Sequence, residues 1–210
     1  MNGTVTDSTE TRQLLARLQA GEAEAFDQLF AQHRAYLHQV IDMRLDAQIR
    51  RRVDASDVVQ ETQLEAARRM AEYLRRQPMP FRVWLRKTAH ERLGKLRRQH
   101  VVAEKRRVRR EVALPYRSTF QLAQRLLGRG STPSQQVGRR ELAERVRRAI
   151  GQLEELDREI VLMLDIEGLS SQQVGYVLDL EPASVRRRHA RALLKVHKIL
   201  RAGGLTESQL

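Results

Sequence analysis

Cysteine is absent from the 210-residue sequence, and aromatic residues make up only 4% of it. Without cysteine there is no disulfide framework and no zinc site with thiolate ligands. No apolar run approaches the roughly 18–20 residues that a membrane-spanning helix needs, and the N-terminal MNGTVTDSTE lacks the basic start and apolar stretch of a signal peptide. We therefore expect a cytoplasmic protein without membrane insertion.

The residues that are present favour helices. Leu, Ala, Arg, Glu and Gln are abundant, whereas the long β-branched and aromatic runs that strands prefer are missing. At 41% hydrophobic residues, the chain has enough Leu, Val, Ile and Ala to bury hydrophobic cores. The composition predicts an all-α fold.

Positive charge is in excess and is unevenly distributed. The formal net charge is +13 at pH 7, and residues 81–110 alone hold twelve basic and two acidic side chains, a net charge of +10. Such an excess favours a polyanionic partner, because every phosphate that is neutralised releases condensed counterions. A concentrated basic helix is the electrostatic pattern expected of a nucleic-acid contact, although charge alone does not distinguish DNA from RNA or an anionic membrane.

Apolar spacing predicts several helices in the first half of the chain. One begins near Leu14 and is interrupted at Gly21, and a second covers Phe26–Ile41. Asp54 and Ser56 are candidate N-caps of a third helix that runs to about Arg75. The sequence Gln-Pro-Met-Pro at 77–80 breaks that helix, and residues 81 to about 110 can then form one long basic helix.

The middle of the chain is typical of a linker. Pro115 and the segment 128–134 (GRGSTPS) are rich in helix breakers, and the apolar residues between Leu114 and Leu127 suggest one short helix within the linker. We therefore expect two small helical domains. The predicted divisions are a tail at 1–11, a domain at 12–110, a linker at 111–138, a second domain at 139–200 and a tail at 201–210.

The most specific local pattern lies between residues 153 and 198. Gly168 can end a helix in the left-handed conformation, and Ser170 stands three residues before Gln173, as in a capping box. A short helix would then run to about Leu178, followed by the turn Asp-Leu-Glu at 179–181 and a helix with Pro182 at its first position. A short helix, a tight turn and a basic helix together indicate a helix-turn-helix.

Arginine on the last of these helices suits DNA reading. Its planar guanidinium can bind a guanine edge or a phosphate through two hydrogen bonds, while Val185, Ala192, Leu193 and Val196 can pack inward. The alternative is that the run is only a solvated helix face. The capped helix and turn before it, and the single sign of its charge, argue against that alternative.

Two segments of this motif resemble region 4 of the ECF (extracytoplasmic-function) sigma factors of RNA polymerase. Residues 153–170 are similar to the start of that region, and residues 185–192 are similar to its recognition helix. Asp179 stands where the family usually has Gly, and His189 where Leu is common; Arg187 replaces a small polar residue. The resemblance implies that the helix reads the −35 promoter element through Ser184, Arg186, Arg187, Arg188, Arg191 and Lys195.

Residues 54–62 resemble part of region 2 of the same family. In the family, this part docks on the β′ subunit of the polymerase. Asp57, Gln60 and Glu61 would share one helix face, and an acidic face on a basic protein suits a basic protein partner. Asp57 would also stabilise the helix N-terminus, whereas no cluster with metal-ligand spacing lies nearby. The resemblance implies binding to core RNA polymerase through Asp54, Asp57, Val58, Gln60 and Glu61.

Residues 80–93 resemble regions 2.3 and 2.4, which read the −10 element. The resemblance places Trp84, the single tryptophan, in the hydrophobic core, and it implies that the loop around 75–80 captures a base of the non-template strand. A pocket beside the strand is needed for a base outside the duplex. The predicted −10 contacts are Arg75, Arg76, Gln77, Phe81, Arg82, Trp84, Arg86, Lys87, His90, Lys95, Arg97 and Arg98.

The resemblance covers about 14–100 and 142–199 and implies a sigma factor that binds core RNA polymerase (β′ and β subunits) and directs initiation at promoter DNA. Without the resemblance, the sequence indicates only two helical DNA-binding modules. The alternative is therefore a helix-turn-helix regulator that acts without replacing sigma. A nuclease or RNA-modifying enzyme is disfavoured, since no Gly-rich phosphate loop, metal cluster or nucleophile–base pair is visible. We predict no catalytic residue, metal or cofactor. Family members are often held by an anti-sigma factor, and no residue here identifies one.

Overall fold

The computed structural model describes residues 7–45, 47–101, 122 and 136–202, and every element in them is helical. This agrees with the all-α fold that the composition predicts. The chain divides into two compact units. One comprises Met1–Arg106 together with Gly175–Asp179, and the other comprises Arg107–Val174 and Leu180–Leu210. The assignment of functional domains within them remains a prediction.

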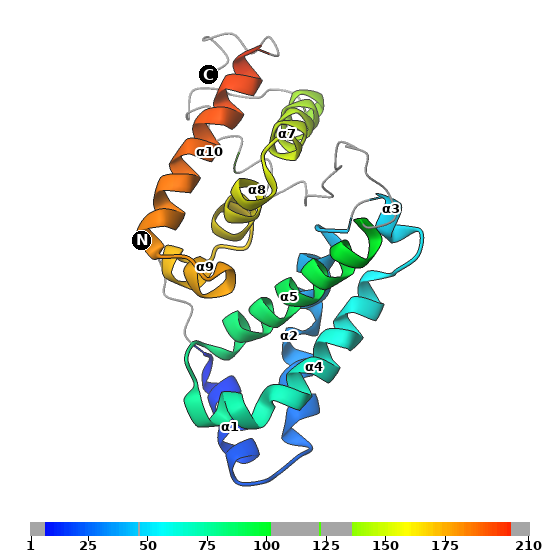
Figure 1. Ribbon diagram of the computed structural model, residues 1–210, viewed down its shortest axis with the longest axis vertical. Coiled ribbons are helices and arrows are strands. Elements are labelled where there is room, and N and C mark those ends of the chain that lie inside the picture. The colour runs from blue at the N-terminus through cyan, green and yellow to red at the C-terminus, as the bar shows by residue number, and fades with distance from the viewer. Residues whose placement is uncertain (1–6, 46, 102–121, 123–135, 203–210) are drawn as a thin grey trace. The chain divides into compact units, whose positions relative to one another are not determined.

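In the described part of residues 1–106, the first unit is built from helices α1 to α5, which follow the chain from its blue to its green segments (Figure 1). Helices α1 and α2 pack together, and α2, α4 and α5 pack against one another in pairs. Their bounds are α1 Thr9–Gln19, α2 Ala25–Asp42, α3 Ala47–Arg50, α4 Ala55–Arg76 and α5 Phe81–Val101. The short α3 was not expected from the sequence.

Local signals set the ends of these helices. Asp54 and Asp57 form a reciprocal capping box at the start of α4, as the candidate cap at Asp54 predicts. Gly21 has φ +93°, a backbone angle that glycine adopts without steric cost, and it separates α1 from α2. At the other end of α4, Gln77 has φ +36° and ends the helix in the left-handed region.

The hydrophobic core of this unit is made of aliphatic and aromatic side chains from all five helices. On α5, Phe81, Leu85, Ala89 and Leu93 recur every fourth residue and are buried, so one stripe of this basic helix faces inward. Because that stripe fixes the rotation of α5, it also decides which of its cations reach solvent.

Most of the helical residues from 136 onward belong to the second unit, and the second half of α9 is grouped with the first. Helix α7 spans Gln136–Gly151, and α8 spans Glu155–Val161 and continues into the π-helical turn η1 at Leu162–Ile166. Next come α9 at Ser171–Leu178 and α10 at Pro182–Ala202. Helix α10 packs on both α7 and α8, with Val185, Ala192 and Val196 buried. The continuous apolar spacing after Arg139 thus belongs to two helices.

The turns around α9 follow the predicted pattern closely. Gly168 has φ +73°. The Ser170 N–H donates to Gln173 Oε1 at 2.8 Å, and the Gln173 N–H donates to Ser170 Oγ at 3.2 Å, which is a complete capping box. Asp179 has φ +55°, a left-handed position that Asp tolerates better than most residues. Pro182 opens α10. The helix-turn-helix is therefore present.

Two predictions fall mainly outside the described residues. The basic helix was expected to reach about Arg110, and α5 is described as far as Val101. The short helix expected within 111–138 is described only at Leu122, which is buried. Positions 102–121 and 123–135 are not described.

Candidate nucleic-acid interface

The acidic face predicted on α4 is largely on the surface. Asp54, Asp57, Gln60 and Glu61 are exposed. Val58 is only 2% exposed and belongs to the hydrophobic core, so its predicted contact with a partner does not fit the structure, and it acts instead by holding α4 in place.

The acids of this face are also used within the protein. Asp57 Oδ2 accepts the Asp54 N–H at 3.1 Å within the capping box. Glu61 pairs with Arg92 of α5. Asp57 therefore combines a cap with an exposed charge, and Glu61 is already partly neutralised.

Leu64 extends the face by one helical turn and was missed in the sequence. It is 60% exposed, one of two large exposed apolar side chains among the described residues. It lines a hollow of about 410 Å³ with Phe26 and Asp27 of α2 and with Gln60. Its position four residues after Gln60 would have placed it on this face, but its exposure depends on how α2 packs against α4.

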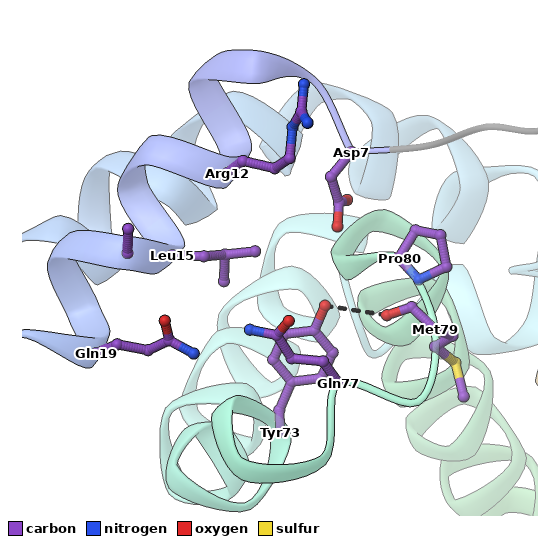
Figure 2. A pocket seen from close by; sticks show the side chains of 9 residues that line it. Asp7, Arg12, Leu15, Gln19, Tyr73, Gln77, Met79 and Pro80 are labelled. Carbon is purple, nitrogen blue, oxygen red and sulfur yellow. Dashed lines mark hydrogen bonds between the residues drawn. The ribbon is translucent and has the colours of Figure 1, made fainter.

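The loop between α4 and α5 forms one wall of a larger cavity. This cavity has a volume of about 640 Å³, and Figure 2 shows side chains of the first helix and of the loop facing each other across it. The predicted residue Gln77 lies in the wall together with Tyr73, whose hydroxyl donates to the Met79 carbonyl at 3.0 Å. Arg75 and Arg76 are exposed at the end of α4. The full lining is Asp7, Arg12, Leu15, Ala16, Gln19, Tyr73, Gln77, Met79 and Pro80.

Asp7 joins this cavity to the start of α5. Its Oδ1 and Oδ2 accept the Phe81 N–H at 2.9 and 3.0 Å. Burial raises the pKa of the Asp7 carboxyl, against the opposing effects of the hydrogen bonds from the Phe81 and Arg82 backbone and of the Arg12 charge. Burial, and then the charge of Asp7, raise the pKa of Tyr73. Asp7 lies 74 residues before Phe81, so no local pattern could have identified it.

Trp84 stands in an aromatic cluster beneath the loop. Its ring centroid lies 4.6 Å from that of Tyr73 and 5.6 Å from that of Phe81, and His33 approaches Phe81 at 5.5 Å. Burial and the nearby Arg82 lower the pKa of His33 to about 4, so its ring is neutral at pH 7. These contacts favour the packing role that the family resemblance gave Trp84.

The polar side chains predicted to contact DNA from α5 differ in exposure. Lys95 and Arg98 are exposed, and Arg82, Lys87, His90 and Arg97 are partly buried. Arg82 stacks on the Tyr36 ring at 4.0 Å, and Arg97 donates to the Arg44 carbonyl at 3.3 Å.

Arg86 and Phe81 are both 0% exposed. Their predicted contacts with DNA do not fit this burial. Phe81 belongs to the inward stripe of α5, and Arg86 lies beside that stripe, so both side chains point into the domain. Neither side chain is exposed for a contact with DNA in this structure.

Most of the predicted DNA-contacting cations of α10 are exposed. Arg186, Arg187, Arg191 and Lys195 are exposed, and Ser184 is partly buried. The Arg187 guanidinium donates to Ser184 Oγ at 3.0 Å, so these two predicted residues lie together in the first turns of the helix. The N-terminal part of a recognition helix is the part that meets base edges.

Arg188 differs from its neighbours because a buried acid holds it. Its Nη1 lies 3.2 Å from Oδ1 of Asp157, a residue of α8 that is 5% exposed, and Lys195 Nζ lies 3.4 Å from Oδ2 of the same carboxylate. His189 is bound similarly, with its Nε2 2.6 Å from Asp165 Oδ2. A polar partner thus replaces the apolar packing expected of a Leu at position 189. The sequence had not identified either acid.

Within 7–45, 47–101, 122 and 136–202, no group of three or more His, Asp or Glu residues could hold a metal ion. No helix in the described part of the chain is long and apolar enough to cross a membrane.

Comparison with known proteins agrees with this geometry. Residues 143–196 match the family described as Sigma-70, region 4. The chain is 29% identical over 192 residues to the RNA polymerase sigma factor CnrH of Cupriavidus metallidurans, which covers 91% of this chain and 94% of the relative. It is 28% identical over 195 residues to the RNA polymerase sigma-H factor of Pseudomonas aeruginosa, again over 91% and 94%.

The solved structures agree as well. The structure of CnrH in complex with the cytosolic domain of CnrY matches with a TM-score of 0.59 at 25% identity. The match covers 92% of this chain and 99% of that one, so the likeness includes both helical units and is not confined to the helix-turn-helix.

Proposed function

Because the chain belongs to the ECF group of the sigma-70 family and is a sigma factor that directs promoter-specific initiation by RNA polymerase, we propose that it divides this work among three surfaces. One docks on core RNA polymerase, one captures the −10 strand and one reads the −35 duplex. The relatives do not support a regulator that acts without replacing sigma. The exposed arginines of a complete helix-turn-helix, inside the matched residues 143–196, carry the proposal.

Docking on core RNA polymerase, through its β′ subunit, is assigned to the exposed face of α4. Asp57 and Gln60 supply charge and an amide, and Leu64 supplies an apolar anchor beside the 410 Å³ hollow. An exposed large apolar side chain within a polar rim is the usual composition of a docking surface. Acidic charge on a chain with net charge +13 favours a basic partner through electrostatic complementarity.

Capture of the −10 strand is assigned to the loop 77–80 and the exposed cations near it. The cavity of about 640 Å³ beside this loop is large enough for one nucleobase, and its lining offers amide and charged groups to a base edge. Arg75 and Arg76 precede the loop, and Lys95 and Arg98 lie further along α5. Such cations bind phosphates without regard to sequence, which leaves the choice of base to the cavity.

Reading of the −35 duplex is assigned to the first half of α10. Arg186, Arg187 and Arg191 are exposed and can reach base edges or phosphates in the major groove. Arg188 is proposed as a support of the helix, because its guanidinium is bound to the buried Asp157.

RNA polymerase and promoter DNA are thus the partners, and we propose that the protein meets them in the cytoplasm. Sigma factors act by binding and are not enzymes, and we assign no catalytic residue. The similar CnrH structure contains the cytosolic domain of CnrY; an anti-sigma factor of this kind is proposed as a further partner here.

Binding measurements test the proposal directly. The purified chain is titrated with core RNA polymerase, and promoter fragments are then footprinted with the resulting complex and with the chain alone. We expect a one-to-one complex whose footprint covers both −10 and −35 positions, and little protection by the free chain. Tight, specific protection by the free chain without binding to core RNA polymerase would contradict the proposal.

A further inference from the structure

Helix α5 begins without a cap of its own. The residue before Phe81 is Pro80, and Pro78 lies two positions earlier, so neither offers a side-chain acceptor to the first N–H groups of the helix. Unpaired N–H groups at a helix start need an acceptor, and the positive end of the helix dipole favours an anion there. Asp7 meets both needs, since both of its carboxylate oxygens accept the Phe81 N–H.

The neighbouring residue caps a different helix. Ser8 is the N-cap of α1, and its Oγ accepts the Thr11 N–H at 3.1 Å. Two consecutive residues therefore cap two helices that are far apart in the sequence. Because α1 carries Arg12 and Gln19 and the loop that leads into α5 carries Met79 and Pro80, this dipeptide connects the two walls of the 640 Å³ cavity. Figure 2 shows Asp7 between α1 and Pro80.

We propose that Asp7 is a positioning residue for capture of the −10 strand: it caps α5 across the domain and thereby fixes the loop 77–80 against α1. The inference rests on the proposed function of that loop. Asp7 acts through the backbone of α5 and the shape of the cavity, so its loss should change how a base is held and chosen, while the exposed face of α4 keeps its affinity for core RNA polymerase.

Three variants separate this role from simple stabilisation. Asp7→Ala removes the cap, Asp7→Asn keeps an oxygen acceptor of nearly equal capping preference, and Ser8→Ala removes the neighbouring cap of α1 as a matched control. Each full-length variant is assembled with core RNA polymerase. The probe is a fluorescent single strand carrying the −10 sequence of a start site mapped with the wild-type complex, and a scrambled strand measures selectivity.

Loss of a cap typically changes an equilibrium by about fivefold. We therefore expect Asp7→Ala to weaken binding of the −10 strand roughly five- to tenfold and to lower selectivity over the scrambled strand, with unchanged affinity for core RNA polymerase. Asp7→Asn should stay within about twofold of wild type, and Ser8→Ala should leave strand selectivity unchanged. Amide hydrogen exchange at Phe81 should become faster in Asp7→Ala.

Two results would overturn the inference while leaving the proposed function standing. The first is wild-type strand binding and selectivity in Asp7→Ala. The second is an equal loss of strand and core RNA polymerase binding in Asp7→Ala and Ser8→Ala, which would make the cap purely structural. If the wild-type complex itself does not distinguish the −10 strand from the scrambled one, the assignment of the loop fails, and the inference fails with it.

Discussion

His33 should make the first helical unit less stable in mild acid. Its ring packs on Phe81, and its Nε2 is buried without a hydrogen-bond partner, so burial and the nearby Arg82 charge lower its pKa from 6.5 to about 4. In the unfolded chain the ordinary pKa returns. Between these two values the unfolded chain binds more protons than the folded one, so the free energy of unfolding falls as the pH falls.

The size of the effect follows from that difference. A shift from 6.5 to about 4 corresponds to about 2 kcal/mol of lost stability between pH 7 and pH 5 by proton linkage. The ring is partly exposed, and solvent screening reduces this to roughly 1 kcal/mol. His33→Leu removes the titrating group, so the variant should lose about 1 kcal/mol less than wild type over the same interval.

Fluorescence of Trp84 provides the assay. It is the single tryptophan and lies in the same aromatic cluster as Phe81, so urea unfolding followed by its emission reports this unit. His38, exposed on the same helix, gives the matched control His38→Leu, which should retain the pH dependence of wild type. Equal pH dependence in wild type and His33→Leu would refute the assignment of a His33 ring that is neutral in the folded protein.

Three further outcomes follow from the surfaces. Leu64→Arg should weaken binding to core RNA polymerase at least tenfold, about 1.4 kcal/mol. The control Glu72→Arg on the same helix should leave that affinity unchanged. Equal losses in a binding titration would contradict the assignment of the docking face to Leu64 and its neighbours. Arg187→Ala should weaken −35 duplex binding by about 1–3 kcal/mol and relax base preference. Arg188→Ala should instead lower the melting temperature. The reverse pattern would refute the assignment of Arg187 to DNA and of Arg188 to support of the helix. Asp157→Ala should destabilise the second unit by about 1–2 kcal/mol in calorimetry, because the carboxylate is buried while its partners Arg188 and Lys195 reach solvent. An unchanged transition would exclude these ion pairs as a support.

The exposed acid Asp57 is a less clean test of docking than Leu64. Asp57→Arg should abolish binding to core RNA polymerase if the face is correctly assigned, but it also removes the hydrogen bond to the Asp54 N–H and so weakens a cap by about 1 kcal/mol. Asp57→Asn keeps an acceptor and isolates the charge. The Leu64 side chain is apolar and forms no capping hydrogen bond, so its replacement tests docking more directly.

Helix ends and turns could be predicted from the sequence wherever the contacts that determine them join residues close together in the chain. The capping boxes at Asp54 and Ser170, the left-handed Gly168 and the proline that opens α10 each depend on residues within a few positions of one another. The helix-turn-helix could therefore be predicted almost to the residue. Hydrophobic periodicity likewise predicted most of the helices.

Tertiary contacts account for what the sequence did not show. Arg86 looked like one cation among many, but the packing of α5 buries it completely. Arg188 was grouped with Arg187 because its partner Asp157 lies 31 residues away. The Asp7 cap spans 74 residues. Each depends on which helices meet, and no spacing rule along a single helix contains that information.

Transcription itself tests the central claim most directly. Core RNA polymerase, with and without the purified chain, is supplied with genomic DNA, and the 5′ ends of the transcripts are mapped. We expect new start sites that appear only with the chain and share a common −10 and −35 sequence. These sites should disappear with a variant that combines Arg187→Ala and Leu64→Arg. Start sites identical to those of core RNA polymerase alone would contradict the central claim.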